Sequence, residues 1–398
     1  MSKIYDAVHG FIHFNALEQE LIDSSVFQRL HYIHQLGIAY LIYPGGTHTR
    51  FEHSLGTMEL ATRLFDQLCM KYPEDVKDPV YWRQILRLAA LCHDLGHLPF
   101  SHTAEKRLLG RGGHEKWTAR IIASEELRPL WKKVANRDVE GDVIKMALGK
   151  EKLGELFPEK TLTPWEEVLS DIIAGDFFGA DRIDYLLRDA KSTGLSYGLF
   201  DYNQLIEMLA LIPKEGGGFL LGVEENGLES CEALLLARHF MQRRLYQYAS
   251  SKAYSFHLSR FMAAHYHDLK YTSELDAYLS MSEPEILLQL RKASTDSSHS
   301  GHFDARSLLR RKERFQAIAL PLDALEKPLS DFKERLSIPD SQIEWDLSGL
   351  LAKSTGLSLP IVRRNGTVAP SHELSQISIP PTKKNWLYLA PEFHFSGD

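Results

Sequence analysis

Residues 92–102 read CHDLGHLPFSH, and this stretch decides how the sequence is interpreted. It places three histidines and an aspartate directly after an apolar segment with helical spacing. Because helix positions four apart share a face, His93 and His97 are expected on one face, with Asp94 beside His93. A glycine and a proline within the stretch indicate that the helix ends there. We therefore expect a helix that ends in a cluster of potential metal ligands.

The surrounding chain has a predominantly helical pattern from Leu17 to about Arg260, with apolar residues recurring every three or four positions. Clusters of glycine and proline indicate loops at residues 43–46, 110–113 and 213–218. After the last loop, residues 218–223 and the turn sequence at residues 225–227 predict a short β-hairpin, with another helix from near Ser230. This part is therefore predicted to be mainly α, with a short β-hairpin insertion.

The pattern changes beyond about Tyr271. Residues 294–300 are rich in serine, and short apolar runs follow at residues 317–322, 358–362 and 385–389. We expect a helical core over residues 1–270. A smaller α+β lobe is expected over residues 271–398, with a role in oligomerisation or regulation.

Composition narrows the class of protein. The 398 residues are 44% hydrophobic and 25% charged, which is typical of soluble globular proteins. The net charge of −7 argues against a general nucleic-acid coat. The three cysteines form no CxxC pair, which argues against a disulfide framework. Neither a signal peptide nor a membrane-spanning stretch is recognisable, so we expect a cytoplasmic protein without a membrane partner.

Two more motifs carry potential ligands, because His53 lies in the run RFEHSLG and Asp181 lies in the run GADRIDY. Each has an ordinary alternative. A lone histidine is usually a surface or satisfied core residue, and an acid at a helix start is usually a cap. A second His–Asp pair, His267-Asp268, has no companions, so the dipeptide alone is weak evidence. The prediction rests on all the motifs together.

Together these residues resemble the metal-binding pattern of the HD superfamily of phosphohydrolases. The runs TRFEHSLG, CHDLGHLPFSH, GADRIDYLLRD and RRLYQY resemble the branch of SAM-and-HD-domain triphosphohydrolases and bacterial deoxyguanosine triphosphatases. The resemblance covers approximately residues 4–260 and implies an HD-domain helical core, with no SAM-type domain expected before it. It also implies one divalent metal ion held by His53, His93, Asp94 and Asp181.

This ligand set suits Fe, Mn, Zn or Mg, because imidazole and carboxylate groups make a mixed nitrogen and oxygen site. Four protein ligands around a six-coordinate ion leave positions for water and a phosphate oxygen. That is the chemistry of phosphoester hydrolysis. A second Mg²⁺ can accompany a nucleotide substrate.

The resemblance further implies a catalytic group formed by His97, His102, His114 and Glu105. It implies that His102 is the general acid toward the departing sugar oxygen, and that His97 and His114 contact the α-phosphate or orient water. Glu105 and Glu115 support them. The alternative is that histidines after a helix end face solvent, and for His114 both interpretations stay open.

Substrate contacts are also implied. Arg50 is expected near the α-phosphate, with Arg182 and Arg238 near the β- and γ-phosphates, because guanidinium groups bind phosphate bidentately. Isolated arginines are more often solvated. Arg182 replaces a lysine that is usual in the SAM-containing branch, a change that keeps the charge but alters the geometry of the donors.

The deoxyribose and its 3′-hydroxyl are expected to contact Gln35, Leu36, Tyr185, Asp189 and Tyr246. A tight wall of Leu36 and Tyr246 against C2′ would exclude a 2′-hydroxyl, since overfilling a packed pocket costs roughly 1–3 kcal/mol. Ordinary helix packing is the open alternative for both side chains.

Regulated members of the family bind activating nucleotides at a separate site. At the positions of this chain that correspond to that site, most residues differ from those of the regulated members. Asp23 is the same as in those members. His31 and Gln204 stand where they have arginines, and Glu224 and Glu225 stand where they have basic residues. Acidic side chains repel a triphosphate, so we expect no activation at that site.

A basic run also lies in the C-terminal part, formed by Arg306, Arg310, Arg311, Lys312 and Arg314. It is interleaved with apolar residues, which favours a solvated helix face over a nucleic-acid site.

We predict that the protein hydrolyses deoxynucleoside triphosphates (dNTPs) to deoxynucleosides and tripolyphosphate. The resemblance implies a homo-oligomer, a dimer or a tetramer. Two alternatives stay open: an HD phosphodiesterase or nucleotidase acting on another phosphoester, and a nucleotide-binding or nucleic-acid-binding sensor that keeps the metal site. Three arginines from distant segments favour a long polyphosphate.

Overall fold

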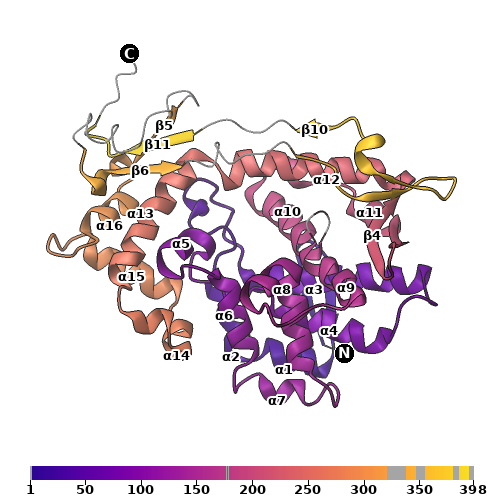
Figure 1. The fold of residues 1–398 in the computed structure, drawn as a ribbon. Coiled ribbons are helices and arrows are strands. Elements are labelled where there is room, and N and C mark those ends of the chain that lie inside the picture. The colour runs from indigo at the N-terminus through magenta and orange to yellow at the C-terminus, as the bar shows by residue number, and fades with distance from the viewer. Residues whose placement is uncertain are drawn as a thin grey trace.

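The computed structural model describes residues 2–175, 177, 179–320, 338–346, 355–379 and 385–393. These residues are mainly helical with a few small sheets, which confirms the predicted mainly α fold with an α+β C-terminal lobe (Figure 1). The α-helices in this part of the chain are α1 (Ala16–Ile22), α2 (Ser25–Gln28), α3 (Arg50–Lys71), α4 (Pro79–Cys92), α5 (Glu105–Leu108), α6 (Gly113–Ile122), α7 (Arg128–Trp131), α8 (Val139–Leu156), α9 (Pro164–Ala174), α10 (Ala180–Thr193), α11 (Tyr202–Glu207), α12 (Leu228–Met241), α13 (Ala249–His265), α14 (Leu275–Leu279), α15 (Glu283–Ala293) and α16 (His302–Leu309). The strands are β1 (Ser2–Asp6), β2 (Gly10–Phe14), β3 (Leu209–Pro213), β4 (Phe219–Glu224), β5 (Gln316–Leu320), β6 (Ile343–Asp346), β7 (Thr355–Gly356), β8 (Pro360–Val362), β9 (Val368–Pro370), β10 (Ser378–Ile379) and β11 (Asn385–Leu389).

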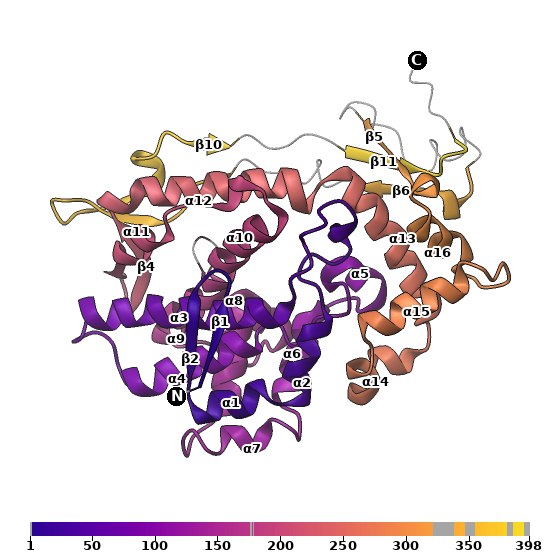
Figure 2. The same cartoon turned by 180° about the vertical axis from the view of Figure 1, so that it is seen from behind.

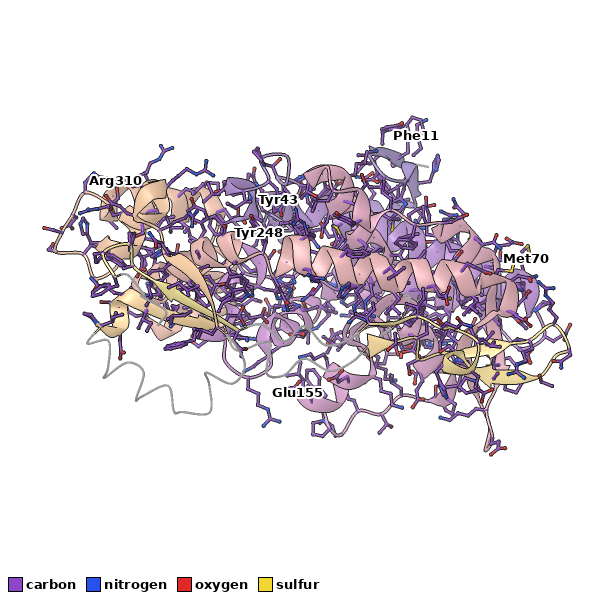
Figure 3. The ribbon with its side chains drawn as sticks, turned by 90° about the horizontal axis from the view of Figure 1, so that it is seen from above. Phe11, Tyr43, Met70, Glu155, Tyr248 and Arg310 are labelled. Carbon is purple, nitrogen blue, oxygen red and sulfur yellow. The ribbon has the colours of Figure 1, made fainter. Side chains whose placement is uncertain are left out.

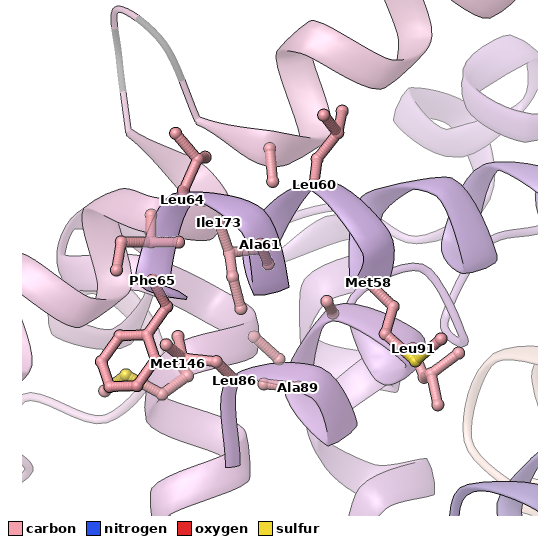
Figure 4. Close-up of a cluster of buried hydrophobic side chains, with 14 of the residues drawn as sticks. Met58, Leu60, Ala61, Leu64, Phe65, Leu86, Ala89, Leu91, Met146 and Ile173 are labelled. Atoms are coloured by element: carbon pink, nitrogen blue, oxygen red, sulfur yellow. The ribbon is translucent and has the colours of Figure 1, made fainter. Parts of the chain in front are cut away.

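The core of the molecule lies between α3, α4, α8, α9 and α10. Helix α3 packs against α4 and α10, and α8 packs against α4 and α9. Each buried large apolar side chain contributes roughly 1.5–3 kcal/mol, so this packing fixes the helix ends that carry the site. Buried side chains in this core, shown in Figure 4, include Met58, Leu60, Ala61, Leu64, Phe65, Leu86, Ala89, Leu91, Met146 and Ile173.

Helix boundaries place three of the predicted metal ligands. The backbone N–H of Thr49 donates to Oε1 of Glu52 at 3.3 Å, a capping contact that starts α3 and puts His53 in its first turn. Helix α10 starts just before Asp181, whose carboxylate is favoured at a helix N-terminus. Helix α4 ends just before His93. The three side chains therefore lie at helix ends.

The predicted β-hairpin is present, but its turn was placed wrongly. Strands β3 and β4 are antiparallel, with Leu209 opposite Val223, and residues 214–218 form the turn. Residues 225–227 instead form a helical turn that leads into α12. Strand β3 has no alternating pattern, because Leu209–Ile212 is buried throughout. Its pairing therefore cannot be recognised from hydrophobic periodicity.

The C-terminal residues pack at two places. Strand β8 joins β4 in parallel and β9 pairs with β8, so residues 360–370 extend the sheet of the hairpin. Strands β5, β11 and β6 form a second sheet at the far end of the molecule, beside α13 and α16 (Figure 1). The predicted apolar runs thus contain strands, although Pro321 and Leu322 lie outside the described residues.

Helices α12 and α13 connect the two ends, and α12 crosses the top of the molecule in Figure 1. Seen from above, Tyr43 and Tyr248 lie together, with ring centroids 6.1 Å apart (Figure 3). This contact joins the loop before α3 to the start of α13. From behind, the β1–β2 hairpin lies beside α3 (Figure 2).

Among the described residues, no helix combines the length and apolar character that crossing a bilayer requires.

Candidate metal centre and active site

Three side chains from three helix ends converge on one point. Nε2 of His53 lies 3.0 Å from Oδ1 of Asp181, and Nε2 of His93 lies 3.7 Å from the same oxygen. One donor atom from each of the three lies within 4.8 Å of the others. Nitrogen and oxygen donors at this spacing suit a borderline or hard divalent cation.

Contacts outside the cluster orient both imidazoles. Nδ1 of His53 bonds to Oδ2 of Asp184 at 2.7 Å, and Nδ1 of His93 bonds to the carbonyl of Ala90 at 2.7 Å. Such bonds hold the Nε2 atoms of metal-binding histidines toward the ion. Nε2 of His93 is buried and has no hydrogen-bond partner among the described residues. An unpaired buried nitrogen of this kind fits a metal ligand, so the residues present fit a divalent cation.

Protonation of the metal-free cluster follows from its charges. Burial opposes protonation of His53, but hydrogen bonds to Asp181 and Asp184 outweigh it and raise its pKa to about 10. Burial also opposes protonation of His93, yet the Asp94 and Asp181 carboxylates raise its pKa. A cation in this position therefore replaces protons.

Asp94 faces both imidazoles while it pairs with an arginine. Its carboxylate oxygens lie 3.5 Å from Nε2 of His53 and 3.5 Å from Nε2 of His93. Arg50 donates to Oδ2 of Asp94 at 2.5 Å and to Oγ of Ser101 at 2.9 Å. Burial opposes ionisation of Asp94, but Arg50 and the histidines hold its pKa well below the usual range. Arg50 thus lies beside the cluster as a fixed, buried positive charge.

The helix before this cluster is shorter than predicted. The Thr118 hydroxyl donates to the carbonyl of His93 at 3.1 Å and accepts the N–H of Gly96 at 3.0 Å. These bonds replace helical ones and turn the chain away after α4. The expectation that His93 and His97 share a helix face is therefore wrong. His97 instead approaches through the turn, with Nε2 3.3 Å from Oδ1 of Asp94.

A second group of histidines lies next to the cluster. The rings of His97 and His114 stack at 3.7 Å, and a nitrogen of each lies within 4.8 Å of one on His102. Glu105 links two of them, at 2.7 Å from Nδ1 of His102 and 2.9 Å from Nδ1 of His114. Burial and the charge of Arg50 hold the pKa of His97 well below its usual range. The side chain of His102 is 65% exposed, so its free nitrogen is accessible.

The residues expected to contact substrate fall into two groups. Gln35, Leu36, His102 and Tyr246 line a cavity of about 660 Å³. Asp189 is buried beside it and accepts from the hydroxyl of Tyr246 at 2.7 Å.

The other group surrounds the expected polyphosphate position. Nε and Nη1 of Arg182 are buried without a hydrogen-bond partner among the described residues. Burial raises the pKa of Tyr185, and the Arg182 and Arg238 charges oppose that rise, which indicates that both charges act on this phenol. Arg238 itself is exposed on α12.

Several residues of this region are missing from the sequence prediction. Asp184 is fully buried, binds His53 and His9, and forms two hydrogen bonds with Arg188 at 2.8 and 2.9 Å. Arg188 also binds Asp6 at 2.7 Å. One signal was available for Asp184, because it lies three residues after Asp181 and therefore on the same helix face. His9 and Asp6 have no local signal.

The side chains at the positions that correspond to a nucleotide-activation site contact other residues of this protein. His31 stacks on Phe51 with ring centroids 3.6 Å apart, and Glu224 pairs with Lys71. The Glu225 carboxylate accepts the N–H of Arg364 at 2.9 Å.

The basic C-terminal run is largely engaged within the protein. Glu313 pairs with Arg306 at 2.5 Å and with Arg310 at 3.3 Å, and Arg314 lies over the ring of Tyr254. The side chain of Lys312 lies outside what the structure describes.

Comparison with known proteins agrees with this geometry. Residues 50–185 match the family model described as HD domain, and residues 200–336 match the one described as HD associated region. The chain is an HD-domain protein. This assignment confirms the resemblance drawn from the sequence motifs.

Relatives of this HD-domain protein include an uncharacterised protein of Methanocaldococcus jannaschii, which is 36% identical over 62% of this chain and 46% of its own length. The human deoxynucleoside triphosphate triphosphohydrolase SAMHD1 is 31% identical over 62% of this chain and 42% of its own length. The chain spans about half the length of the curated relatives it matches.

Solved structures match nearly the whole chain. A hypothetical protein from Aquifex aeolicus superposes with a TM-score of 0.76 and 29% identity, covering 98% of this chain and 97% of its own. A phosphohydrolase from Bacteroides thetaiotaomicron gives a TM-score of 0.74 at 22% identity, covering 98% of this chain and 99% of its own. The second match shows the shared fold alone.

Proposed function

We propose that this protein is a metal-dependent phosphohydrolase that hydrolyses dNTPs to deoxynucleosides and tripolyphosphate. The observation that carries the proposal is the convergence of His53, His93 and Asp181 beside the buried Arg50. Similarity to proteins named deoxynucleoside triphosphate triphosphohydrolase supports the substrate class.

His53, His93 and Asp181 would hold the cation, which is Fe, Mn, Zn or Mg. Asp94, whose carboxylate oxygens lie 3.5 Å from Nε2 of both histidines, would be the fourth ligand. When bound, a divalent cation polarises a phosphoryl group and makes water a stronger nucleophile near neutral pH. Asp184 and the carbonyl of Ala90 keep the two imidazoles turned toward it. A cavity of about 510 Å³ that is lined by His93, Asp94 and Asp181 gives water and phosphate access to these ligands.

The proposed reaction forms a bond from water oxygen to the α-phosphorus and breaks the bond from that phosphorus to O5′ of the sugar. His102 donates the proton that O5′ needs when it leaves. Glu105 accepts from Nδ1 of His102, which turns the exposed ring nitrogen outward for this transfer. His97 and His114, stacked beside it, contact the α-phosphate oxygens or orient the water.

Fixed positive charge holds the polyphosphate in this proposal. Arg50 neutralises the α-phosphate, and Arg182 and Arg238 receive the β- and γ-phosphates. The two unpaired buried nitrogens of Arg182, Nε and Nη1, support this role, because buried N–H groups without acceptors are costly unless a ligand completes their hydrogen bonds.

The sugar is assigned to the cavity beside His102. Asp189 accepts from the 3′-hydroxyl and the Gln35 side-chain amide donates to its oxygen. Tyr185 packs against Tyr246 with ring centroids 5.9 Å apart, and Leu36 closes the wall at C2′. A packed wall at this position favours deoxyribose over ribose.

Phosphorus NMR of each dNTP incubated with the protein and Mn²⁺ or Mg²⁺ tests the proposal. The expected product is tripolyphosphate, with no orthophosphate at early times. Pyrophosphate or orthophosphate as the first product would replace this proposal with a nucleotidase-type reaction. Nucleotide binding without any product would indicate a sensor.

We also propose that the protein forms a homo-oligomer, a dimer or a tetramer, and that the C-terminal lobe contributes to assembly or regulation. Light scattering during size-exclusion chromatography tests this, and a monomer at micromolar concentration would contradict it.

A further inference from the structure

We propose that His48 is a positioning residue of the sugar site, and that through Asp189 and Tyr246 it makes the protein prefer nucleotides that carry a 3′-hydroxyl. This inference rests on the proposed function, because the sugar contacts are assigned there. His48 lies two residues before Arg50, in the segment that leads into α3. The metal centre and the histidine group around His102 do not use it.

The His48 imidazole is one end of a buried chain of hydrogen bonds. Its Nε2 lies 2.7 Å from Oδ1 of Asp189, and the Tyr246 hydroxyl donates to Oδ2 of the same carboxylate at 2.7 Å. His48 is 6% exposed and Asp189 is 1% exposed, so water hardly competes for these bonds. Because a carboxylate only accepts hydrogen bonds, both partners act as donors. The direction of the Asp189 carboxylate is therefore fixed at one oxygen by His48 and at the other by Tyr246.

The other end of this chain is the wall of the sugar cavity. Tyr246 lines the cavity of about 660 Å³, whereas Asp189 and His48 are not among its lining residues and lie behind Tyr246. Burial and the Asp189 charge hold the pKa of Tyr246 well above its ordinary value, so its hydroxyl keeps its proton and stays a donor. A carboxylate has about four acceptor positions, which leaves Asp189 able to take a further bond from a 3′-hydroxyl.

The backbone of His48 holds the second residue that we assign to the 3′-hydroxyl. The His48 carbonyl accepts the N–H of Gln35 at 3.0 Å. His34 and Thr49, the neighbours of Gln35 and His48, form an isolated β-bridge. His48 therefore places Gln35 with its main chain and Asp189 with its side chain.

The same segment makes a second contact of this kind with α10. Five residues after His48, Nδ1 of His53 bonds to Asp184 at 2.7 Å. Asp184 and Asp189 are also five residues apart, so the two segments run antiparallel at these contacts. One imidazole–carboxylate pair lies beside the metal centre and the other beside the sugar cavity. Together they fix how far the sugar contacts lie from the metal centre.

The alternative is a buried pair that serves stability alone. His257 provides an example, because its Nδ1 bonds to Asp304 at 2.8 Å and its Nε2 accepts the N–H of Phe315 at 3.0 Å. Both nitrogens of that ring are used within the fold. Nδ1 of His48 is buried and has no hydrogen-bond partner among the described residues, which costs free energy. The His48 ring thus fits Asp189 better than it fits its other surroundings, as a positioning role requires.

The test compares kcat/KM for dATP with that for 2′,3′-dideoxyATP (ddATP), which lacks only the 3′-hydroxyl. The wild type is expected to prefer dATP by about tenfold or more, the size of one hydrogen bond to a charged group. His48→Phe keeps a ring without a donor, so it should lose most of this preference and hydrolyse ddATP nearly as the wild type does. His257→Asn breaks a purely structural pair and should lower stability without changing the preference.

Two further comparisons separate positioning from general damage. The amide nitrogen of His48→Gln reaches roughly the place of Nε2, whereas that of His48→Asn is too short, so only the first should keep the preference. This pair decides the question even if His48→Phe does not fold. In an Asp189→Ala background, His48→Phe should cause no further loss, because it acts through Asp189.

Calorimetric binding of dATP and ddATP to the metal-free protein separates failure of this inference from failure of the proposed function. Tighter binding of dATP by the wild type and by His48→Gln, lost in His48→Asn and His48→Phe, supports the role of His48 even if no dNTP is hydrolysed. Equal or absent binding of the two nucleotides by the wild type overturns the inference. A preference that survives in His48→Asn and His48→Phe overturns it as well.

Discussion

Asp184 binds Nδ1 of His53 at 2.7 Å, and this bond turns Nε2 of the same imidazole toward Asp181. The carboxylate is fully buried and is held by two hydrogen bonds from Arg188. The histidine that we propose as a metal ligand is thus supported by a charged network that reaches from α10 to the N-terminal hairpin. The network has consequences for protonation, packing and stability.

Metal binding is expected to release protons. The pKa of His53 is about 10 in the metal-free protein, so its imidazole is protonated at neutral pH and must lose a proton to bind a cation. The pKa of His93 is raised as well. Apparent affinity for Mn²⁺ should therefore rise at least about tenfold per pH unit between about pH 7 and pH 9. Calorimetry in buffers of different ionisation enthalpy counts the protons, and a pH-independent affinity without release would contradict the assigned ligand.

Gly56 leaves the space that this network occupies. A Cβ added there would lie 1.9 Å from Oδ1 of Asp184 and 2.4 Å from Nη2 of Arg188. Gly56→Ala is expected to lower the free energy of unfolding by about 1–3 kcal/mol, because overpacking displaces buried charged groups. Urea denaturation of the metal-free protein measures the change.

Gly154→Ala is the matched control, since a Cβ at that helical position meets nothing within 4 Å. It should leave stability unchanged or raise it by up to about 1 kcal/mol. Equal effects at both glycines would argue against the packed network.

Glu283 ties the C-terminal helices to the loop that carries His102. Its buried carboxylate accepts the N–H of His34 at 2.8 Å and of Phe100 at 2.7 Å, and it also binds the His34 ring. Phe100 has φ of 61°, a conformation that needs such support. Glu283→Gln is expected to cost about 1–3 kcal/mol of stability and to reduce kcat.

The stability change should depend on pH. Burial opposes protonation of His34, but Glu283 raises its pKa above 6.5. The stabilisation is therefore complete below about pH 6.5 and is lost as pH rises through the raised value. Denaturation at a series of pH values measures this, with Glu285→Gln, an exposed cap of the same helix, as control. A wild-type advantage that grows with pH would be inconsistent with the pair.

We also predict that dGTP does not activate hydrolysis of other dNTPs through the site used by regulated relatives. Glu224 and Glu225 place negative charge at the positions that correspond to that activation site, and negative charge repels a triphosphate. Rates of dATP hydrolysis with and without dGTP measure this. An increase of about tenfold would contradict it, whereas simple competition agrees with it.

Local motifs allow part of this site to be predicted from the sequence. His53, His93, Asp94 and Asp181 lie in short runs whose residue types and spacing already indicate metal binding. The end of α4 was placed wrongly, because it depends on the Thr118 hydroxyl, which is distant in sequence. When the side chain that ends one helix belongs to another helix, the sequence around the helix end contains no pattern that predicts the end.

Longer-range partners are less predictable still. Glu283 meets Phe100 across 183 positions of the chain, and Trp345 reaches the cavity from a strand of the C-terminal sheet. These contacts depend on how helices α13 to α16 dock, which single-segment periodicity does not encode. Asp184 is the exception, since its spacing from Asp181 places both on one helix face.

Metal content measured by mass spectrometry after loading with Mn²⁺ and desalting tests the central claim most directly. The wild type should retain about one ion per chain, and His53→Ala and Asp181→Asn should retain almost none. The double variant His267→Ala, Asp268→Asn alters the other His–Asp pair, which lies apart from the cluster, and should bind as the wild type does. Full metal content in the His53 and Asp181 variants would contradict the assignment of this site.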